Sequence, residues 1–137
     1  RLAYAQAARN LAEGGRKEDA KKLLNKCDKG ILESNMSYGM VSRGQQQNQI
    51  SLQFFLAASL AGDSLLADKV AASLKKDMQQ QAAYYESLPD NKREAMRFEE
   101  ERNNQYLAGL LQMEQQFKNP APPVMEQPVP KNKDSQK

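Results

Sequence analysis

The feature that most constrains the fold is a pattern that occurs twice, 47 residues apart. In each copy an apolar helical segment ends at a glycine, and an alanine follows five residues later inside a second apolar helix. Glycine permits a tight turn, and alanine lets two helices approach closely. The sequence therefore predicts two antiparallel helical hairpins. The matched positions are Ala8, Leu11, Gly15, Ala20, Leu24 and Cys27 in the first copy, and Phe55, Ala58, Gly62, Ala67, Ala71 and Leu74 in the second.

Apolar residues at three- and four-residue steps predict the helices themselves. We expect an all-α domain over residues 1–118, with about five helices. The expected spans are residues 2–13, 17–30, 49–61, 64–88 and 93–117. Pro89 ends the fourth span, and Asp90 is placed to cap the fifth. The fifth helix is long and is expected to cap the two hairpins.

The two hairpins are joined by the long segment "SNMSYGMVSRGQQQNQ", residues 34–49, which has no helical or strand period. Joins of this length in compact domains are usually functional or disordered. Three interpretations stay open: a lid anchored by Tyr38 that folds back on the hairpins, a contact surface for a partner, or simple disorder. The candidate interaction residues are Met36, Tyr38, Met40, Arg43, Gln46 and Gln47.

Composition narrows the possible chemistry. There is no histidine, which removes the commonest general base and metal ligand, and there is one cysteine. We therefore predict no catalytic, metal or cofactor site in this chain. Cys27 lies on an apolar helix side, where it is either a small buried hydrophobe or a reactive thiol. The net charge is +3, but the lysines of residues 17–29 are interleaved with acids and lack aromatic partners. A nucleic-acid partner is therefore not expected.

Two shorter stretches invite a functional interpretation. Glu99, Glu100 and Glu101 are adjacent, so their side chains point about 100° apart on a helix, which favours a solvated face over a cation site. Tyr84 and Tyr85 are also adjacent, and only one can face the core. We expect Tyr85 in the core and Tyr84 near the surface, where it either packs or serves as an exposed aromatic contact.

The end of the chain differs in composition from the rest. Residues 119–137 contain five of the six prolines and few apolar residues, which predicts a disordered or extended tail. A proline-rich ligand motif from Pro120 to Pro123 is a second interpretation. No segment of the sequence is apolar for long enough to cross a bilayer, so we expect no direct membrane insertion by this chain. Because residue 1 is Arg1 and opens directly into a helical pattern, we interpret the chain as an internal fragment of a longer product.

The repeated small, aromatic, glycine and alanine positions resemble the tetratricopeptide repeat. The spacing of 47 residues exceeds the usual 34, and the tryptophan and terminal proline of that pattern are missing. About 13 residues are thus inserted, and they fall in the 34–49 join.

The order of "LAEGG…A…LL", Tyr38-Gly39 and "KDM…YYESL" also resembles the C-terminal region of a bacterial multi-spanning membrane-protein family. That family is known as a domain of unknown function, and its N-terminal module is related to the protein O-mannosyltransferases, which use lipid-linked sugars. The resemblance covers residues 1–118. It implies a periplasmic, non-catalytic scaffolding domain and makes the parent protein a candidate membrane glycosyltransferase.

The implied partner is the membrane module of the parent chain, or a protein or peptide presented to it. The alternative is a free-standing tetratricopeptide-like adaptor or chaperone, unrelated to glycosylation and located in the cytoplasm. Sequence upstream of Arg1 would separate the two, since only the first requires several apolar spans of about 20 residues.

Overall fold

A computed structural model of the protein describes residues 1–122, which are about 79% helical and contain no strands. The expectation of an all-α fold is therefore confirmed for this part of the chain. The helices are α1 (Leu2–Glu13), α2 (Lys17–Gly30), α3 (Gln46–Ala61), α4 (Ser64–Glu86), α5 (Asp90–Ala95) and α6 (Arg97–Lys118), and a short 3-10 turn, η1, covers Arg43–Gln45.

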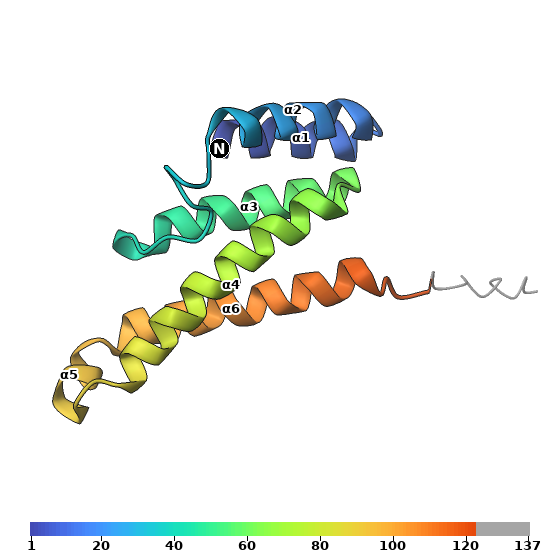
Figure 1. Cartoon of the computed structure of the whole chain (residues 1–137). Coiled ribbons are helices and arrows are strands. Elements are labelled where there is room, and N and C mark those ends of the chain that lie inside the picture. The colour runs from blue at the N-terminus through green and yellow to red at the C-terminus, as the bar shows by residue number, and fades with distance from the viewer. Residues whose placement is uncertain (123–137) are drawn as a thin grey trace, which may run out of the picture.

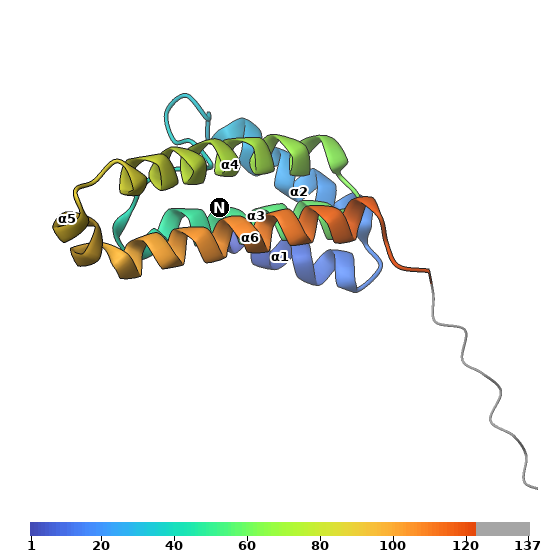
Figure 2. The ribbon, with the colours of Figure 1, turned by 90° about the horizontal axis from the view of Figure 1, so that it is seen from below.

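The helices form two layers. Figure 1 shows α1 and α2 at one end of the stack, α3 in the middle and α6 at the other end, with α4 running obliquely from the end of α3 to the start of α6. In Figure 2 α2 and α4 lie on one side, whereas α1, α3 and α6 lie on the other. Helix α3 contacts α1, α2, α4 and α6, which explains why apolar residues surround most of it. It is the central element of the fold.

The two hairpin turns have the same local structure. Gly15 and Gly62 both adopt a left-handed conformation, with φ of 83° and 76°. In both turns the amide that follows the glycine donates to the carbonyl oxygen five residues earlier, over 2.8 Å and 2.9 Å. The second turn has a further cap, because the Asp63 carboxylate accepts from the backbone amide of Leu66 over 3.2 Å. The positions matched across 47 residues are thus matched in conformation as well.

The core lies between the two layers. Cys27 is buried, which confirms its interpretation as a small hydrophobe, and Tyr85 is buried while Tyr84 is 56% exposed, as expected. The apolar residues Leu107, Leu110, Leu111 and Phe117 predict the inward side of the last helix, but only Leu110 is fully buried and Leu107 partly buried, whereas Leu111 and Phe117 are exposed. The largest fully buried apolar side chains are Tyr38, Phe54, Leu24, Leu74, Met78, Leu110 and Val70.

The two matched alanines, Ala20 and Ala67, are expected to respond differently to replacement by a larger side chain. Ala20 is completely buried, so Ala20→Leu is expected to overpack the α1–α2 hairpin and to cost about 1–3 kcal/mol of unfolding free energy. Ala67 occupies the matched position but lines a small hollow beside Phe55 and Phe117, which gives a larger side chain room. Ala67→Leu is therefore the matched control and should cost less than about 1 kcal/mol. Urea unfolding followed by circular dichroism measures both, and equal costs would contradict this difference in packing.

The connection between the hairpins is shorter than predicted. It covers residues 31–45, because α3 begins at Gln46 and not at Gln49. Gln46 and Gln47 therefore belong to the first turn of α3. The backbone amide of Gln47 donates to the Ser42 hydroxyl over 2.9 Å, which supplies a partner for one amide of the first helical turn. Glutamine is also a good helix former, so the run extends the helix once it is capped.

The predicted fifth helix is two helices, and α4 ends at Glu86, two residues before the expected limit. Met96, with φ of −105° and ψ of 12°, separates α5 from α6. No residue of α5 is buried, so packing does not hold it in line with α6. An ion pair of 2.6 Å from Arg93 to Glu100 crosses the bend. Asp90 is the first residue of α5 and makes no side-chain cap.

Two expectations concern membranes and the tail. In residues 1–122 no helix has both the length and the apolar character needed to cross a membrane. Residues 119–122 are exposed and lie outside the helices, whereas the remainder of the expected tail, 123–137, lies outside the described residues.

Candidate functional site

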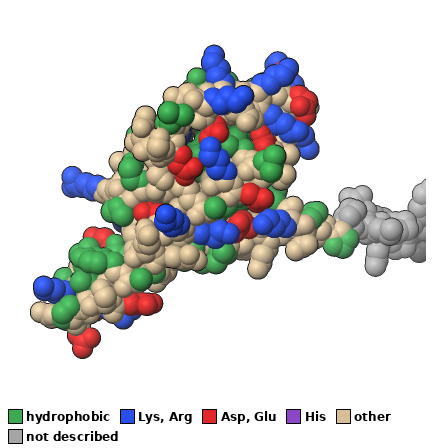
Figure 3. Space-filling model, in the orientation of Figure 1, with side chains coloured by type: hydrophobic (Ala, Val, Ile, Leu, Met, Phe, Trp, Pro, Cys, Tyr) green, Lys and Arg blue, Asp and Glu red, His purple; other side chains and the backbone are tan. Residues whose placement is uncertain are grey.

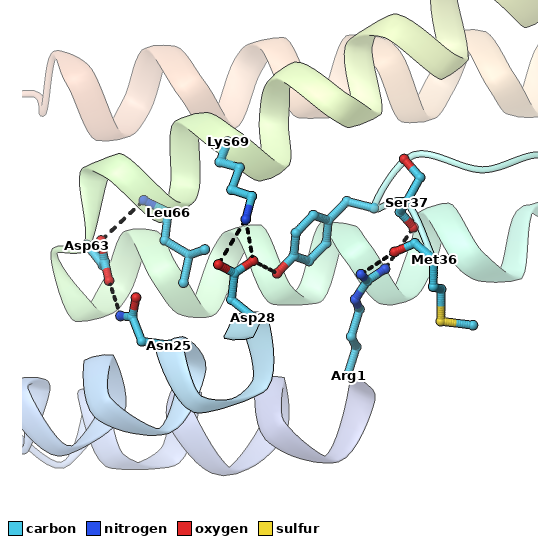
Figure 4. Close-up of polar contacts among 9 residues, drawn as sticks. Arg1, Asn25, Asp28, Met36, Ser37, Asp63, Leu66 and Lys69 are labelled. Atoms are coloured by element: carbon cyan, nitrogen blue, oxygen red, sulfur yellow. Dashed lines mark hydrogen bonds and ion pairs between the residues drawn. The ribbon is translucent and has the colours of Figure 1, made fainter. Parts of the chain in front are cut away.

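Tyr38 anchors the long connection to the helices. Its side chain is completely buried, and its ring lies 5.3 Å from the ring of Phe54 in α3. The guanidinium of Arg1 also lies over the Tyr38 ring, 4.0 Å from its centroid. Arg1 also donates to the carbonyl oxygens of Met36 and of Ser37, the latter over 2.7 Å (Figure 4). The segment around Tyr38 therefore folds back as a structural lid.

The hydroxyl of Tyr38 enters a polar cluster between α2 and α4. It donates to the Asp28 carboxylate over 2.7 Å, and the Lys69 ammonium donates to both oxygens of the same carboxylate, over 2.8 Å and 2.9 Å (Figure 4). Burial alone would raise the pKa of Asp28, but the hydrogen bonds from Lys69 and Tyr38 outweigh it and lower the pKa below its usual value. Burial raises the pKa of Tyr38 far above its usual value, and the hydrogen bond to Asp28 adds to the increase.

This cluster predicts a pH dependence of stability. The folded state keeps Tyr38 neutral, whereas the unfolded chain loses that proton near pH 10. Stability is therefore intact below about pH 10 and falls above it, by about 1.4 kcal/mol per pH unit from this one group. Tyr38→Phe should be the less stable protein at pH 7, and its deficit should shrink from pH 10 to pH 11. Urea unfolding at these pH values measures the deficit, and a constant deficit would contradict the buried phenol.

The residue after Tyr38 lies against α4. A Cβ on Gly39 would lie 2.1 Å from the backbone oxygen of Ser73, so only glycine fits. The Ser73 hydroxyl accepts from the Gly39 amide over 2.9 Å and bonds the Ser37 hydroxyl over 3.0 Å. Ser51 of α3 donates to the Tyr38 carbonyl oxygen over 2.7 Å. The backbone of residues 37–39 is thus bonded to both α3 and α4.

The far end of the connection is fixed by a buried network of amide side chains. The Gln45 amide nitrogen donates to Gln81 of α4 over 2.7 Å and, more weakly, to Asn103 of α6 over 3.4 Å. Asn48 of α3 donates to the Gln45 oxygen and to Asp77 of α4, each over 2.8 Å. The network therefore joins the connection to three helices.

The backbone of Gln45 is strained at this position. It has a φ of 60°, the one non-glycine residue of the described chain with a positive value, and it follows Gly44 at 62°. A left-handed conformation is unfavourable by about 1–2 kcal/mol for a residue other than glycine. The buried hydrogen bonds of the Gln45 side chain offset that strain, which makes this turn a specified part of the fold.

The candidate interaction residues do not form one surface. Tyr38 is buried, Met40 and Gln47 are partly buried, and Met36, Arg43 and Gln46 are exposed. Those six residues line the path of the connection and the start of α3. Tyr84 is exposed near the far end of α4.

The helical layer formed by α1 and α3 carries a shallow groove. It is lined by amide and charged side chains over a small apolar floor, and Arg9 forms an ion pair of 2.8 Å with Glu13 along its rim. By contrast, Figure 3 shows Lys and Arg side chains gathered at the opposite edge of that end of the molecule, over the exposed side of α2. The groove residues are Ala5, Gln6, Arg9, Asn10, Glu13 and Gln53.

Comparison of the chain with protein-family models, with curated proteins and with solved structures finds no match.

Several residues that hold the connection against the helices could not be identified from the sequence. Asp77, Gln81 and Asn103 lie on helices among other polar residues, and nothing in their spacing separates them from a solvated face. Gly39 is an ordinary loop glycine until Ser73 is placed beside it. The α1–α3 groove follows from the repeat, because the repeat sets the two first helices of the hairpins side by side.

Proposed function

We propose that residues 1–118 form a non-catalytic scaffolding domain built from tetratricopeptide-like hairpins, and that a peptide or protein partner binds in the α1–α3 groove. The observation that carries the proposal is the composition of that groove. Gln6, Asn10 and Gln53 each offer both a donor and an acceptor, which suits the backbone of an extended chain. The connection supports the same role, because its hydrogen bonds reach helices of both hairpins.

The proposal extends to the parent protein. The domain serves as the periplasmic scaffold of a membrane protein that resembles a lipid-linked-sugar-dependent O-glycosyltransferase, where it docks on the membrane module or presents an acceptor. The alternative is a free-standing adaptor or chaperone in the cytoplasm, for which the same groove would serve. Several apolar spans encoded upstream of Arg1 would support the first, and a gene that starts without them would contradict it.

Photo-crosslinking in the full-length parent tests the groove. A photoreactive residue at Gln6 or Gln53 should give a discrete adduct with one partner chain, or with the parent's own membrane module. The matched control is the same residue at Lys22, which is exposed on α2. Adducts from Lys22 as abundant as those from the groove would contradict the proposal. Arg9→Glu should reduce the Gln6 adduct. It replaces the ion pair with Glu13 by two like charges, and this changes the rim of the groove where the partner is proposed to bind.

A further inference from the structure

The outward side of α2 carries positive charge that the described residues do not neutralise. The acidic residues of α2 already pair with other cations, at 2.9 Å, 2.9 Å and 2.8 Å: Glu18 with Lys21, Asp19 with Arg16, and Asp28 with Lys69. Within residues 1–122 the remaining lysines of the helix make no ion pair, and they are Lys17, Lys22, Lys26 and Lys29. Acids and lysines alternate in the sequence of α2, but in the fold the acids do not neutralise these lysines.

Three of these residues form one line, which we call the lysine stripe: Lys22, Lys26 and Lys29. They are spaced by four and three residues, so they share one side of the helix and span about 10 Å along it. All of them are exposed. The buried residues of α2 lie on the opposite side, and they are Ala20, Leu24 and Cys27. The stripe therefore points directly away from the core, where Figure 3 shows Lys and Arg side chains gathered over α2.

The fold itself does not require the stripe. Lys22 and Lys26 are like charges one helical turn apart, and such a pair destabilises a helix. Glu33 follows Lys29 by four residues, but among the described residues it makes no ion pair. The carboxylate of Asp63, at the start of α4, accepts from the Asn25 side chain over 2.7 Å and from the Leu66 amide (Figure 4). The positive charge of the stripe is therefore accessible to an anionic partner.

The type of cation distinguishes a lipid surface from an acidic protein or a nucleic acid. The stripe contains lysine and no arginine. Arginine is enriched at protein interfaces, where lysine is depleted, and its planar guanidinium also suits the recognition of nucleic acids. The lysine ammonium is a strongly hydrated point charge on a flexible stem, and lysines near an anionic bilayer are attracted to it without a fixed geometry. A row of lysines on the outer side of one helix therefore favours a bilayer surface.

Two exposed leucines beside the stripe favour the same partner. Leu65 is 85% exposed and lies on the same side of α4 as Lys69, whose ammonium reaches Asp28 of α2 (Figure 4). Leu32 is 57% exposed and follows the end of the stripe by three residues. Apolar side chains next to cations can enter the boundary between headgroups and acyl chains. A phosphate backbone without lipid offers these leucines no apolar contact.

We propose that the lysine stripe binds the surface of a bilayer that contains anionic phospholipid, with Leu32 and Leu65 in the headgroup region and no helix across the membrane. Each lysine near such a surface strengthens binding about fivefold, so the stripe gives a reversible interaction that weakens as salt is added. The α1–α3 groove lies at the opposite edge of this end of the molecule, so it stays accessible when the stripe is bound.

Flotation of the 137-residue chain with lipid vesicles tests the proposal. In about 100 mM salt the chain should bind vesicles of equal parts phosphatidylglycerol and phosphatidylcholine, and it should not bind phosphatidylcholine alone. Lys26→Gln should weaken binding about fivefold, and the triple change of Lys22, Lys26 and Lys29 to Gln should abolish it. The matched control is Lys92→Gln in α5, which removes the same charge from an exposed lysine far from α2 (Figure 1). It should leave binding within about twofold of the wild type, because charges beyond the screening length contribute little.

Leu65→Ser distinguishes a lipid surface from other polyanions. It should weaken binding to the anionic vesicles at least about threefold and leave any binding to duplex DNA unchanged. Equal affinity of the wild-type chain for duplex DNA, at the same phosphate concentration, would overturn the choice of a lipid partner.

The remaining outcomes test the stripe itself. A wild-type chain that does not bind the anionic vesicles overturns the proposal, and so does a triple variant that still binds them. An equal loss of binding in Lys92→Gln and Lys26→Gln would mean that net charge acts and not the stripe. The α1–α3 groove is separate from α2, so failure of partner binding there leaves this result unchanged.

Discussion

Tyr38→Ala is expected to lower the free energy of unfolding by about 3–5 kcal/mol, the range for removing a buried aromatic side chain. The ring fills the space between α3 and the connection, next to Phe54, and the guanidinium of Arg1 covers it. Its removal leaves a cavity and takes one hydrogen bond from Asp28. Domains of this size are stable by about 5–15 kcal/mol, so the variant should be close to unfolding at 37 °C. Urea unfolding followed by circular dichroism gives the value.

The same sequence supplies the controls. Tyr84→Ala removes an identical side chain that is 56% exposed, and it should change stability by less than about 1 kcal/mol. Tyr38→Phe keeps the packing and removes the hydroxyl, so its cost should lie between the two, at about 1–2 kcal/mol. If Tyr38→Ala costs no more than Tyr84→Ala, the connection does not dock on the helices in solution.

The hairpins were predictable because local physics determines them. Apolar spacing of three and four residues fixes which side of a helix is buried, and the two glycines provide the left-handed turns that end the first helix of each hairpin. Repetition added tertiary information, since two units with the same pattern bury the same face. The break at Met96 was not predictable, because a helical pattern continues through it and only the lack of burial in α5 lets the chain bend.

The connection was predictable only in part. Its length and its single tyrosine identified Tyr38 as an anchor, but the partners of Tyr38 come from residues far away in sequence. Arg1 and Ser73 are more than 30 residues from the segment that they bond. The glutamine run reads as a linker because amide residues are mostly exposed in proteins. Gln45 is buried here because Gln81 and Asn103 supply its hydrogen bonds, and composition cannot report that.

Asn48→Leu is expected to cost about 3–5 kcal/mol, although leucine has the same number of side-chain heavy atoms, branched at the same position, and is apolar. Asn48 is completely buried, donates to Gln45 and Asp77, and accepts from the backbone amide of Met40 over 3.0 Å. The substitution leaves these groups buried without that partner, and each unsatisfied group costs about 1–3 kcal/mol. Most of the cost arises from the partners left behind, because the substitution creates no cavity.

Urea unfolding of Asn48→Leu and of Gln46→Ala tests whether the hydrogen bonds of the buried amide network are needed for stability. Gln46 lies two residues away on the same helix and is exposed, so Gln46→Ala should change stability by less than about 1 kcal/mol. A double-mutant cycle between Asn48→Leu and Gln45→Ala should show a coupling of about 1 kcal/mol or more, because the two side chains share a hydrogen bond of 2.8 Å. Additive costs would mean that water replaces the amide partners. In that case the Asn48–Gln45 hydrogen bond would not offset the strain of the left-handed Gln45. Additive costs would therefore also contradict the account given above of the turn at residues 43–45.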